Sequence, residues 1–217
     1  MGLQHSRGRE SAGKMKLLQL IDLQGAQLWP EALDPAEQTL LLEEVRAVVR
    51  AAPLVRPQTP GGRRMSVRMT AAGSFGWLSD RRGYRYAERH PQGMGWPPIP
   101  PLALAVWQRV AEAARAPECC LVNFYGEGAR MGLHQDRDEA DFTQPVVSIS
   151  LGDAGLFRIG GTERGGRTGS AWLGSGDVVV LGGPARLAWH GVDRIRFGSS
   201  TLLPKGGRIN LTLRVVT

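Results

Sequence analysis

The segment MGLHQDRDEADF, residues 131–142, holds a histidine and an aspartate two positions apart, His134 and Asp136. Alternate residues of a β-strand project from one face, about 6 to 7 Å apart along the backbone, so this imidazole and carboxylate are placed to bind one metal ion. His190, in the apolar run AWHGV, is a third candidate ligand, although a lone histidine there is more often a core residue. Two histidines and a carboxylate form a facial triad with open coordination positions, which suits iron(II). Hydrolytic zinc is the alternative for these ligands.

A second group of polar side chains lies in the segment RINLTLR, residues 208–214. These side chains alternate with aliphatic residues and are Arg208, Asn210, Thr212 and Arg214. Such a strand has one polar, cationic face, which is ordinarily exposed to water but inside a barrel would bind a small dicarboxylate at both ends. Asn123 and Tyr125, in VNFYGEG, also share one face and offer an amide and a phenol to the same ligand.

The elements that must position these side chains are short β-rich runs, separated by glycines, from residue 118 onward. Such runs predict an antiparallel barrel or jelly roll. Two helices should pack against it. The first begins at Asp34, which is followed by Pro35 and by an acid three positions after the cap, and it ends before Pro53. The second is expected over residues 101–115.

The 217 residues are interpreted as one domain, 17–217, behind a polar, basic and disordered tail, 1–16. Within the domain, residues 57–100 are rich in glycine, proline and arginine, with scattered aromatic residues. A segment of this length is too long for a simple connection in a small domain, so we expect it to carry function or short strands of its own.

The net charge of +7 is concentrated in one part of the chain, because eight arginines and only two acids lie from Arg56 to Arg89. That segment is the candidate surface for a polyanion. The two cysteines, Cys119 and Cys120, are adjacent and poorly placed to link distant parts of the fold, which favours a reducing compartment. No apolar run is long enough to cross a bilayer. We therefore expect a cytoplasmic protein, monomeric and without a membrane partner.

In order along the chain, these elements resemble the AlkB family of iron(II)- and 2-oxoglutarate-dependent dioxygenases, and its bacterial DNA-repair members most closely. The resemblance extends from about residue 65 to the C-terminus and rests on the pattern NFY…G…HQDRDE…VVSISLG…GDVVVLGG…R…HG…RINLTLR. It implies an α+β, mainly β fold. The expected core is a double-stranded β-helix (jelly roll) over residues 118–217, with two supporting helices and a nucleotide-recognition lid over residues 57–100.

The resemblance also assigns roles to individual residues. The implied metal ligands are His134, Asp136 and His190. The residues implied to bind 2-oxoglutarate are Asn123, Tyr125, Arg208, Asn210 and Arg214. The residues implied to contact the substrate are Met69, Trp77, Tyr84, Tyr86, Asp138 and Arg164. Glu139 and Asp141 are expected to be solvated surface charges. One position departs from the pattern, since Leu181 in VVVLGG stands where an aromatic residue is expected.

The activity implied by the resemblance is oxidative demethylation of N-alkylated bases, such as 1-methyladenine and 3-methylcytosine, with Fe(II), 2-oxoglutarate and O2. The expected partner is alkylated DNA, preferably single-stranded, or RNA. A tRNA-modifying or protein-directed dioxygenase of the same fold is the alternative, and the arginines and stacking aromatics of the lid weigh against a protein substrate. A non-catalytic barrel with a structural metal is a further alternative, in which no coordination position would be open.

Overall fold

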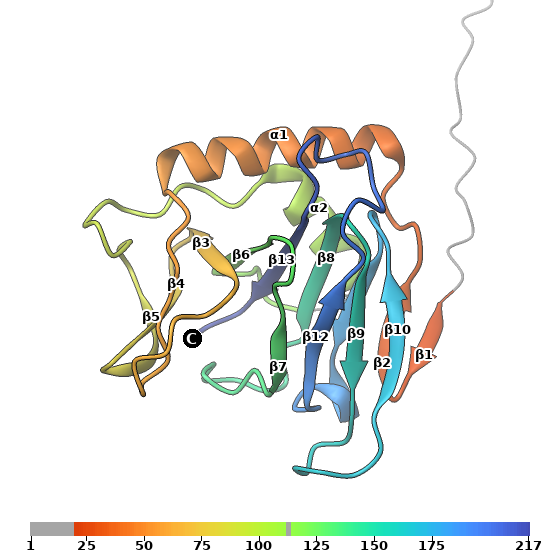
Figure 1. Cartoon of the computed structure of the whole chain (residues 1–217). Coiled ribbons are helices and arrows are strands. Elements are labelled where there is room, and N and C mark those ends of the chain that lie inside the picture. The colour runs from red at the N-terminus through yellow and green to blue at the C-terminus, as the bar shows by residue number, and fades with distance from the viewer. Residues whose placement is uncertain (1–19, 112–113) are drawn as a thin grey trace, which may run out of the picture.

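The computed structural model describes residues 20–111 and 114–217 and folds them into two antiparallel sheets, two α-helices and a separate hairpin (Figure 1). The predicted disordered tail, residues 1–16, lies outside the described residues. In chain order the elements are β1 (Ile21–Leu23), β2 (Ala26–Trp29), α1 (Pro35–Ala51), β3 (Arg68–Gly73), β4 (Gly76–Asp80), β5 (Gly83–Ala87), α2 (Pro101–Val110), β6 (Cys119–Tyr125), β7 (Met131–His134), β8 (Val146–Gly152), β9 (Gly155–Ile159), β10 (Gly169–Leu173), β11 (Val178–Leu181), β12 (His190–Ile195) and β13 (Arg208–Arg214).

The alternating segment RINLTLR forms β13, which lies inside the larger sheet between β8 and β6. The order of that sheet is β1-β2-β11-β8-β13-β6-β3. The aliphatic side chains Ile209, Leu211 and Leu213 belong to the core that both helices share. Because the side chains of a strand alternate, the polar face of β13 points to the other side of the sheet, where the cavity described below lies.

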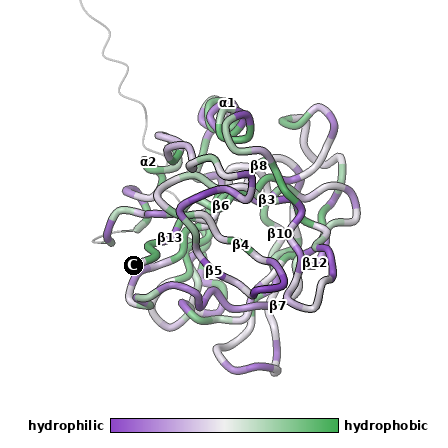
Figure 2. Tube along the Cα trace, turned by 90° about the vertical axis from the view of Figure 1, so that its left-hand side faces the viewer, coloured by the Kyte–Doolittle hydropathy of each residue, from purple (hydrophilic) through white to green (hydrophobic). Residues whose placement is uncertain are grey.

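Helix α1 begins where the sequence predicts, because Asp34 and Glu37 form a capping box. The Asp34 carboxylate accepts from the backbone N–H of Glu37 at 2.8 Å, and the Glu37 carboxylate accepts from the N–H of Asp34 at 2.9 Å. Its buried residues, among them Leu41 and Val45, pack on the larger sheet beside Val106 of α2. In the view turned by 90°, α1 lies outside the strands and carries hydrophobic and hydrophilic residues along its length (Figure 2).

The smaller sheet, β10-β9-β12-β7, completes the jelly roll. A second core joins the sheets, with Phe157 and Ile159 from the smaller one and Val179 and Leu181 from the larger one. The predicted mainly β fold with two supporting helices is thus confirmed. Among the described residues, no helix is long and apolar enough to span a membrane.

The structure adds or changes three elements. Strands β1 and β2 extend the larger sheet from the N-terminal side and were not predicted. Strand β3 lies within the segment 57–100 but pairs with β6 in the larger sheet, so the part of that segment that forms a separate sheet is the hairpin β4–β5. Helix α2 ends at Val110, earlier than predicted. The guanidinium of Arg115 instead donates to the carbonyl of Thr217, a tertiary contact that residue periodicity does not reveal.

Candidate active site

A cavity of about 470 Å³ opens between the two sheets and under the β4–β5 hairpin. Thirteen of its lining residues decide its chemistry, and they are Asn123, Tyr125, His134, Asp136, His190, Arg208, Asn210, Thr212 and Arg214 from the β-core and its loops, together with Met69, Trp77, Tyr84 and Asp138. Twelve of these belong to the set that the sequence singled out by resemblance, and Thr212 shares the polar face of β13. Two residues of that set, Tyr86 and Arg164, do not line the cavity.

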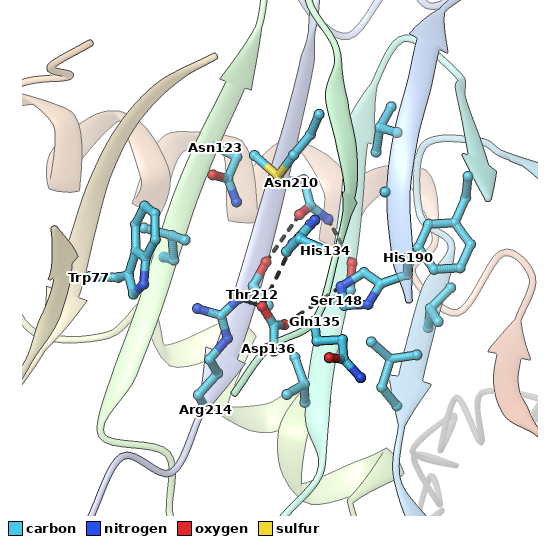
Figure 3. A pocket seen from close by; sticks show the side chains of 18 of the residues that line it. Trp77, Asn123, His134, Gln135, Asp136, Ser148, His190, Asn210, Thr212 and Arg214 are labelled. Carbon is cyan, nitrogen blue, oxygen red and sulfur yellow. Dashed lines mark hydrogen bonds and ion pairs between the residues drawn. The ribbon is translucent and has the colours of Figure 1, made fainter. Parts of the chain in front are cut away.

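The three predicted metal ligands lie together at the cavity (Figure 3), with one ligand atom of each within 4.8 Å of the others. The Nε2 atoms of His134 and His190 are each 3.7 Å from a carboxylate oxygen of Asp136. The Nδ1 atoms face the carbonyls of Gly132 and Ala188 at 3.0 and 2.9 Å. Those contacts favour a proton on Nδ1 and leave both Nε2 lone pairs directed at the carboxylate, which is the arrangement of metal-binding histidines.

The protonation states of these groups fit a divalent cation. Burial, with the neighbouring His134 ring, lowers the pKa of His190 to about 4, so its imidazole is neutral. Burial would raise the pKa of Asp136, but the Arg214 guanidinium, 2.8 Å from Oδ1, outweighs it and holds the pKa of this carboxyl below its usual range. Asp136 Oδ2 is buried and has no hydrogen-bond partner. A buried, ionised carboxylate with one unpartnered oxygen, beside two imidazole nitrogens, is what a metal ion would satisfy.

Local backbone structure brings these ligands together in a way that strand alternation does not explain. The spacing predicted that His134 and Asp136 share one strand, and this is wrong. Strand β7 ends at His134, so Asp136 lies in the loop that follows. The backbone carbonyl of Asp136 accepts from Arg186 Nη1 at 2.7 Å, which holds the loop. Beside His190, a Cβ at Gly191 would lie 2.6 Å from the carbonyl oxygen of Met131, so only glycine permits this approach of β12 to β7.

The polar face of β13 continues the cavity from the metal ligands. Arg208 is 1% exposed, and its hydrogen bonds go to neutral groups, the Leu173 carbonyl at 3.1 Å and the Ser150 hydroxyl at 2.7 Å. Its Nε and the Asn123 Oδ1 are buried without a hydrogen-bond partner. Asn210 donates to the Ser148 hydroxyl at 2.7 Å. This end of the cavity therefore presents a buried positive charge and amide groups to a ligand.

At the other end of β13, Arg214 belongs to a buried charge network that sequence reasoning missed. Arg214 Nη2 lies 2.8 Å from Asp136 Oδ1, and its Nε lies 3.5 Å from Glu139 Oε1. Arg186 Nη2 lies 3.0 Å from the other Glu139 oxygen. The Glu139 side chain is 1% exposed, so the prediction that it is a solvated charge is wrong. No signal near Glu139 in the sequence marks it as buried, because its partners Arg186 and Arg214 lie far along the chain.

The hairpin β4–β5 places its aromatic residues over the cavity. The rings of Trp77 and Tyr84 stack with centroids 5.4 Å apart and planes inclined by 17°. The Trp77 indole N–H donates to the Asp138 carboxylate at 2.8 Å, so the hairpin and the metal-ligand loop are in contact. Tyr86 shares that face of the hairpin but does not line the cavity; its hydroxyl donates to Glu139 and accepts from Arg214. Arg164 lies over the Trp189 ring, 5.9 Å from its centroid.

A jelly roll with a His-Asp-His cluster and a buried arginine on β13 of the opposite sheet defines the class of Fe(II)- and 2-oxoglutarate-dependent oxygenases. Residues 25–214 match the family model of the 2OG-Fe(II) oxygenase superfamily. The chain is 57% identical over 191 residues to an alpha-ketoglutarate-dependent dioxygenase AlkB homolog of Caulobacter vibrioides, with 88% of this chain and 87% of the relative covered. It is 40% identical to the Escherichia coli alpha-ketoglutarate-dependent dioxygenase AlkB, over 84% of this chain and 86% of that protein. The chain therefore belongs to the AlkB family.

Two further relatives extend the comparison. A DNA N(6)-methyladenine demethylase of Arabidopsis thaliana, ALKBH1D, is 41% identical over 46% of this chain and 25% of its own length. The solved structure of OsALKBH1 superposes with a TM-score of 0.73 at 29% identity and covers 91% of this chain and 99% of that one. The enzyme uses Fe(II), with 2-oxoglutarate and O2 as cosubstrates, as its superfamily does. The interpretation as a non-catalytic barrel is thereby excluded.

Proposed function

We propose that this dioxygenase repairs N-alkylated bases, such as 1-methyladenine and 3-methylcytosine, in DNA and RNA by oxidative demethylation, with single strands preferred. The observation that carries the proposal is that one cavity brings together the His-Asp-His cluster, the carboxylate of Asp138 and the stacked pair of Trp77 and Tyr84. A flat aromatic platform and a carboxylate acceptor beside a metal site match a base with an exocyclic amino group.

The proposed roles follow from the atoms that each residue leaves available. His134, Asp136 and His190 would hold Fe(II) through the two Nε2 atoms and the Asp136 carboxylate. Arg208 would bind one carboxylate of 2-oxoglutarate, because its guanidinium is buried among neutral partners. The remaining residues proposed to enclose 2-oxoglutarate are Asn123, Tyr125, Asn210 and Arg214, which line the same cavity.

When bound, Fe(II) supplies the activation of O2 that couples the decarboxylation of 2-oxoglutarate to succinate and CO2 with the hydroxylation of an N-alkyl carbon. The residues of the chain orient the reactants around it. Asp138 would accept a hydrogen bond from the exocyclic amine of the base and so fix which ring nitrogen faces the metal. Loss of the hydroxylated methyl group as formaldehyde then restores the unmodified base.

The position of the cavity supports the proposed preference for single strands. A base inside a duplex can reach a cavity between two sheets only after it has left the stack, which costs a few kcal/mol. A base in a single strand needs no unpairing from a partner strand before it enters the cavity. We also propose that the enzyme is cytoplasmic, since its two free thiols, Cys119 and Cys120, are buried and fit a reducing compartment. We further propose that it acts as a monomer.

The test uses a short single strand with one 1-methyladenine, and the readouts are the mass of the strand and the succinate formed. We expect the strand to lose one methyl group, with formaldehyde and succinate formed together, and the variant His134→Ala to form neither. Succinate formation with every methylated DNA strand unchanged would refute DNA repair. Parallel reactions with methylated tRNA and with a methylated peptide test the two alternative substrate classes.

A further inference from the structure

A second cavity, of about 670 Å³, lies against the same hairpin. The residues of β4 and β5 alternate, so Leu78 and Arg85 point to the face opposite the one that carries Tyr84 and Tyr86. Both Leu78 and Arg85 line the second cavity, and Trp77 lines both cavities. The two-stranded hairpin therefore separates the proposed base site, on one face, from a second cavity on the other face, to which no role has been given.

Positive charge exceeds negative charge around this second cavity. Four arginines line it, and Asp80 is the only carboxylate among its lining residues: the arginines are Arg56, Arg82, Arg85 and Arg89. Asp80 is paired with Arg85 through two hydrogen bonds of 2.9 and 2.7 Å and lies 3.4 Å from Arg82. Arg89 donates to the neutral carbonyl of Gly93. In the described part of the chain neither Arg56 nor Arg89 forms a salt bridge, so both exposed guanidiniums at the cavity are available to an anion.

The remaining lining is typical of a site for an anion that carries a flat apolar group. Trp96 contributes its ring, with its indole N–H already bonded to the Ala87 carbonyl. His90 is held by the backbone, with Nε2 at 2.9 Å from the Pro53 carbonyl and Nδ1 accepting from the N–H of Gln92. Aromatic faces beside arginines are the usual lining for a nucleotide, in which the base stacks and the phosphate pairs with a guanidinium.

We propose that the second cavity binds the nucleotide adjacent to the target base, with Arg56 and Arg89 bound to its phosphodiester. The inference rests on the proposed nucleic-acid substrate and adds a second subsite to it. Because Trp77 borders both cavities, a strand with its target base under the hairpin can continue over this side chain into the second cavity. Only the flank on one side of the target base can follow that path.

The experiment compares the double variant Arg56→Gln/Arg89→Gln with the control Arg63→Gln/Arg64→Gln. The control removes two exposed arginines from the same segment that do not line the cavity. Each protein is given three single strands of equal length, with the methylated base at the 5′ end, at the centre or at the 3′ end. Circular dichroism and the melting temperature establish that both variants are folded.

For the Arg56/Arg89 variant we expect KM to rise about tenfold, with kcat unchanged, on two of the three strands. These are the strand with the methylated base at its centre and one of the two strands with the methylated base at an end. The substrate without the relevant flank keeps the wild-type KM. The magnitude of the slope of log affinity against log salt falls by about 1.4 for the flanked substrates, because two phosphate contacts to a single strand are lost. The control variant changes KM about twofold or less, equally on all three strands.

An equal rise of KM on all three strands, or equal effects of the two double variants, would overturn the subsite, because either result describes general attraction to a cationic surface. Binding of the same methylated strands in the absence of O2, measured by fluorescence anisotropy, separates this failure from failure of the proposed function. A wild-type enzyme that demethylates no strand, but binds them with the flank dependence described, would refute the repair activity and retain the subsite.

Discussion

Strand β13 carries two arginines on the same face, and the two ends of the strand place them in different surroundings. Arg208 is bonded to the Leu173 carbonyl and the Ser150 hydroxyl, and burial lowers its pKa to about 10. Arg214 is equally buried but lies 2.8 Å from the carboxylate of Asp136, which raises its pKa. The charge of Arg208 therefore has no acidic hydrogen-bond partner, whereas the charge of Arg214 is paired with a carboxylate.

This difference shows that alternation along a strand determines which side chains reach a cavity, whereas neighbouring loops determine what they do there. A buried cation with neutral partners is costly unless a ligand brings the opposite charge, which fits the proposed binding of a 2-oxoglutarate carboxylate at Arg208. A buried cation between Asp136 and Glu139 already has its opposite charges. We therefore assign Arg214 mainly to holding the metal ligand and Arg208 mainly to binding the cosubstrate.

The largest effect on turnover is expected from Asp136→Ala. This change removes the carboxylate that pairs with Arg214 and belongs to the metal-binding cluster. Loss of one ligand from a three-residue metal site should lower kcat/KM for 2-oxoglutarate turnover by at least about 1000-fold, or about 4 kcal/mol. Titration of the variant with Fe(II) measures the loss of metal affinity directly. Chelation of the wild type should abolish turnover, and added Fe(II) should restore it. Retention of wild-type Fe(II) affinity would contradict the role of Asp136.

The next effect concerns stability at the same end. Glu139→Gln keeps the shape of the side chain but removes the negative charge between Arg186 and Arg214, which leaves two buried guanidiniums with one carboxylate fewer. We expect the free energy of unfolding to fall by about 3 kcal/mol, as when one partner of a buried pair is removed. Denaturant unfolding measures it, with Asp141→Asn, in the same loop, as a control expected to cost far less. A loss below about 1 kcal/mol would mean that the pairing is not needed for stability.

At the Arg208 end we expect an effect on binding and not on the metal. Arg208→Gln removes a charge-assisted contact worth about 1.5 to 3 kcal/mol, so KM for 2-oxoglutarate should rise by about 10-fold to about 100-fold. Fe(II) affinity should remain that of the wild type, in contrast to Asp136→Ala. An unchanged KM would place the cosubstrate carboxylate elsewhere and remove the distinction between the two arginines.

The sequence predicted those features of fold and site that depend on local periodicity. The capping box at Asp34 and Glu37 and the alternation of β13 follow from residues close in the chain, and both are present. The resemblance brought together distant residues that periodicity cannot join, such as His134 and His190. The burial of Glu139 was not predicted, because in sequence it is one acid among several, and the cations that make its burial favourable, Arg186 and Arg214, lie 47 and 75 positions away.

The smallest effect tests how the hairpin is attached to the Arg214 end. Burial raises the pKa of Tyr86, so at neutral pH its phenol is a donor, and it bonds to Glu139. Tyr86→Phe should therefore lower the free energy of unfolding by about 1 kcal/mol. Tyr84→Phe, on the same face of the hairpin but with a half-exposed side chain, should not change it. If Tyr86 contacts the substrate, as the resemblance implies, its replacement would instead raise KM for the methylated strand and leave stability unchanged. Measurement of both quantities on both variants decides whether this tyrosine anchors the hairpin or binds the nucleic acid.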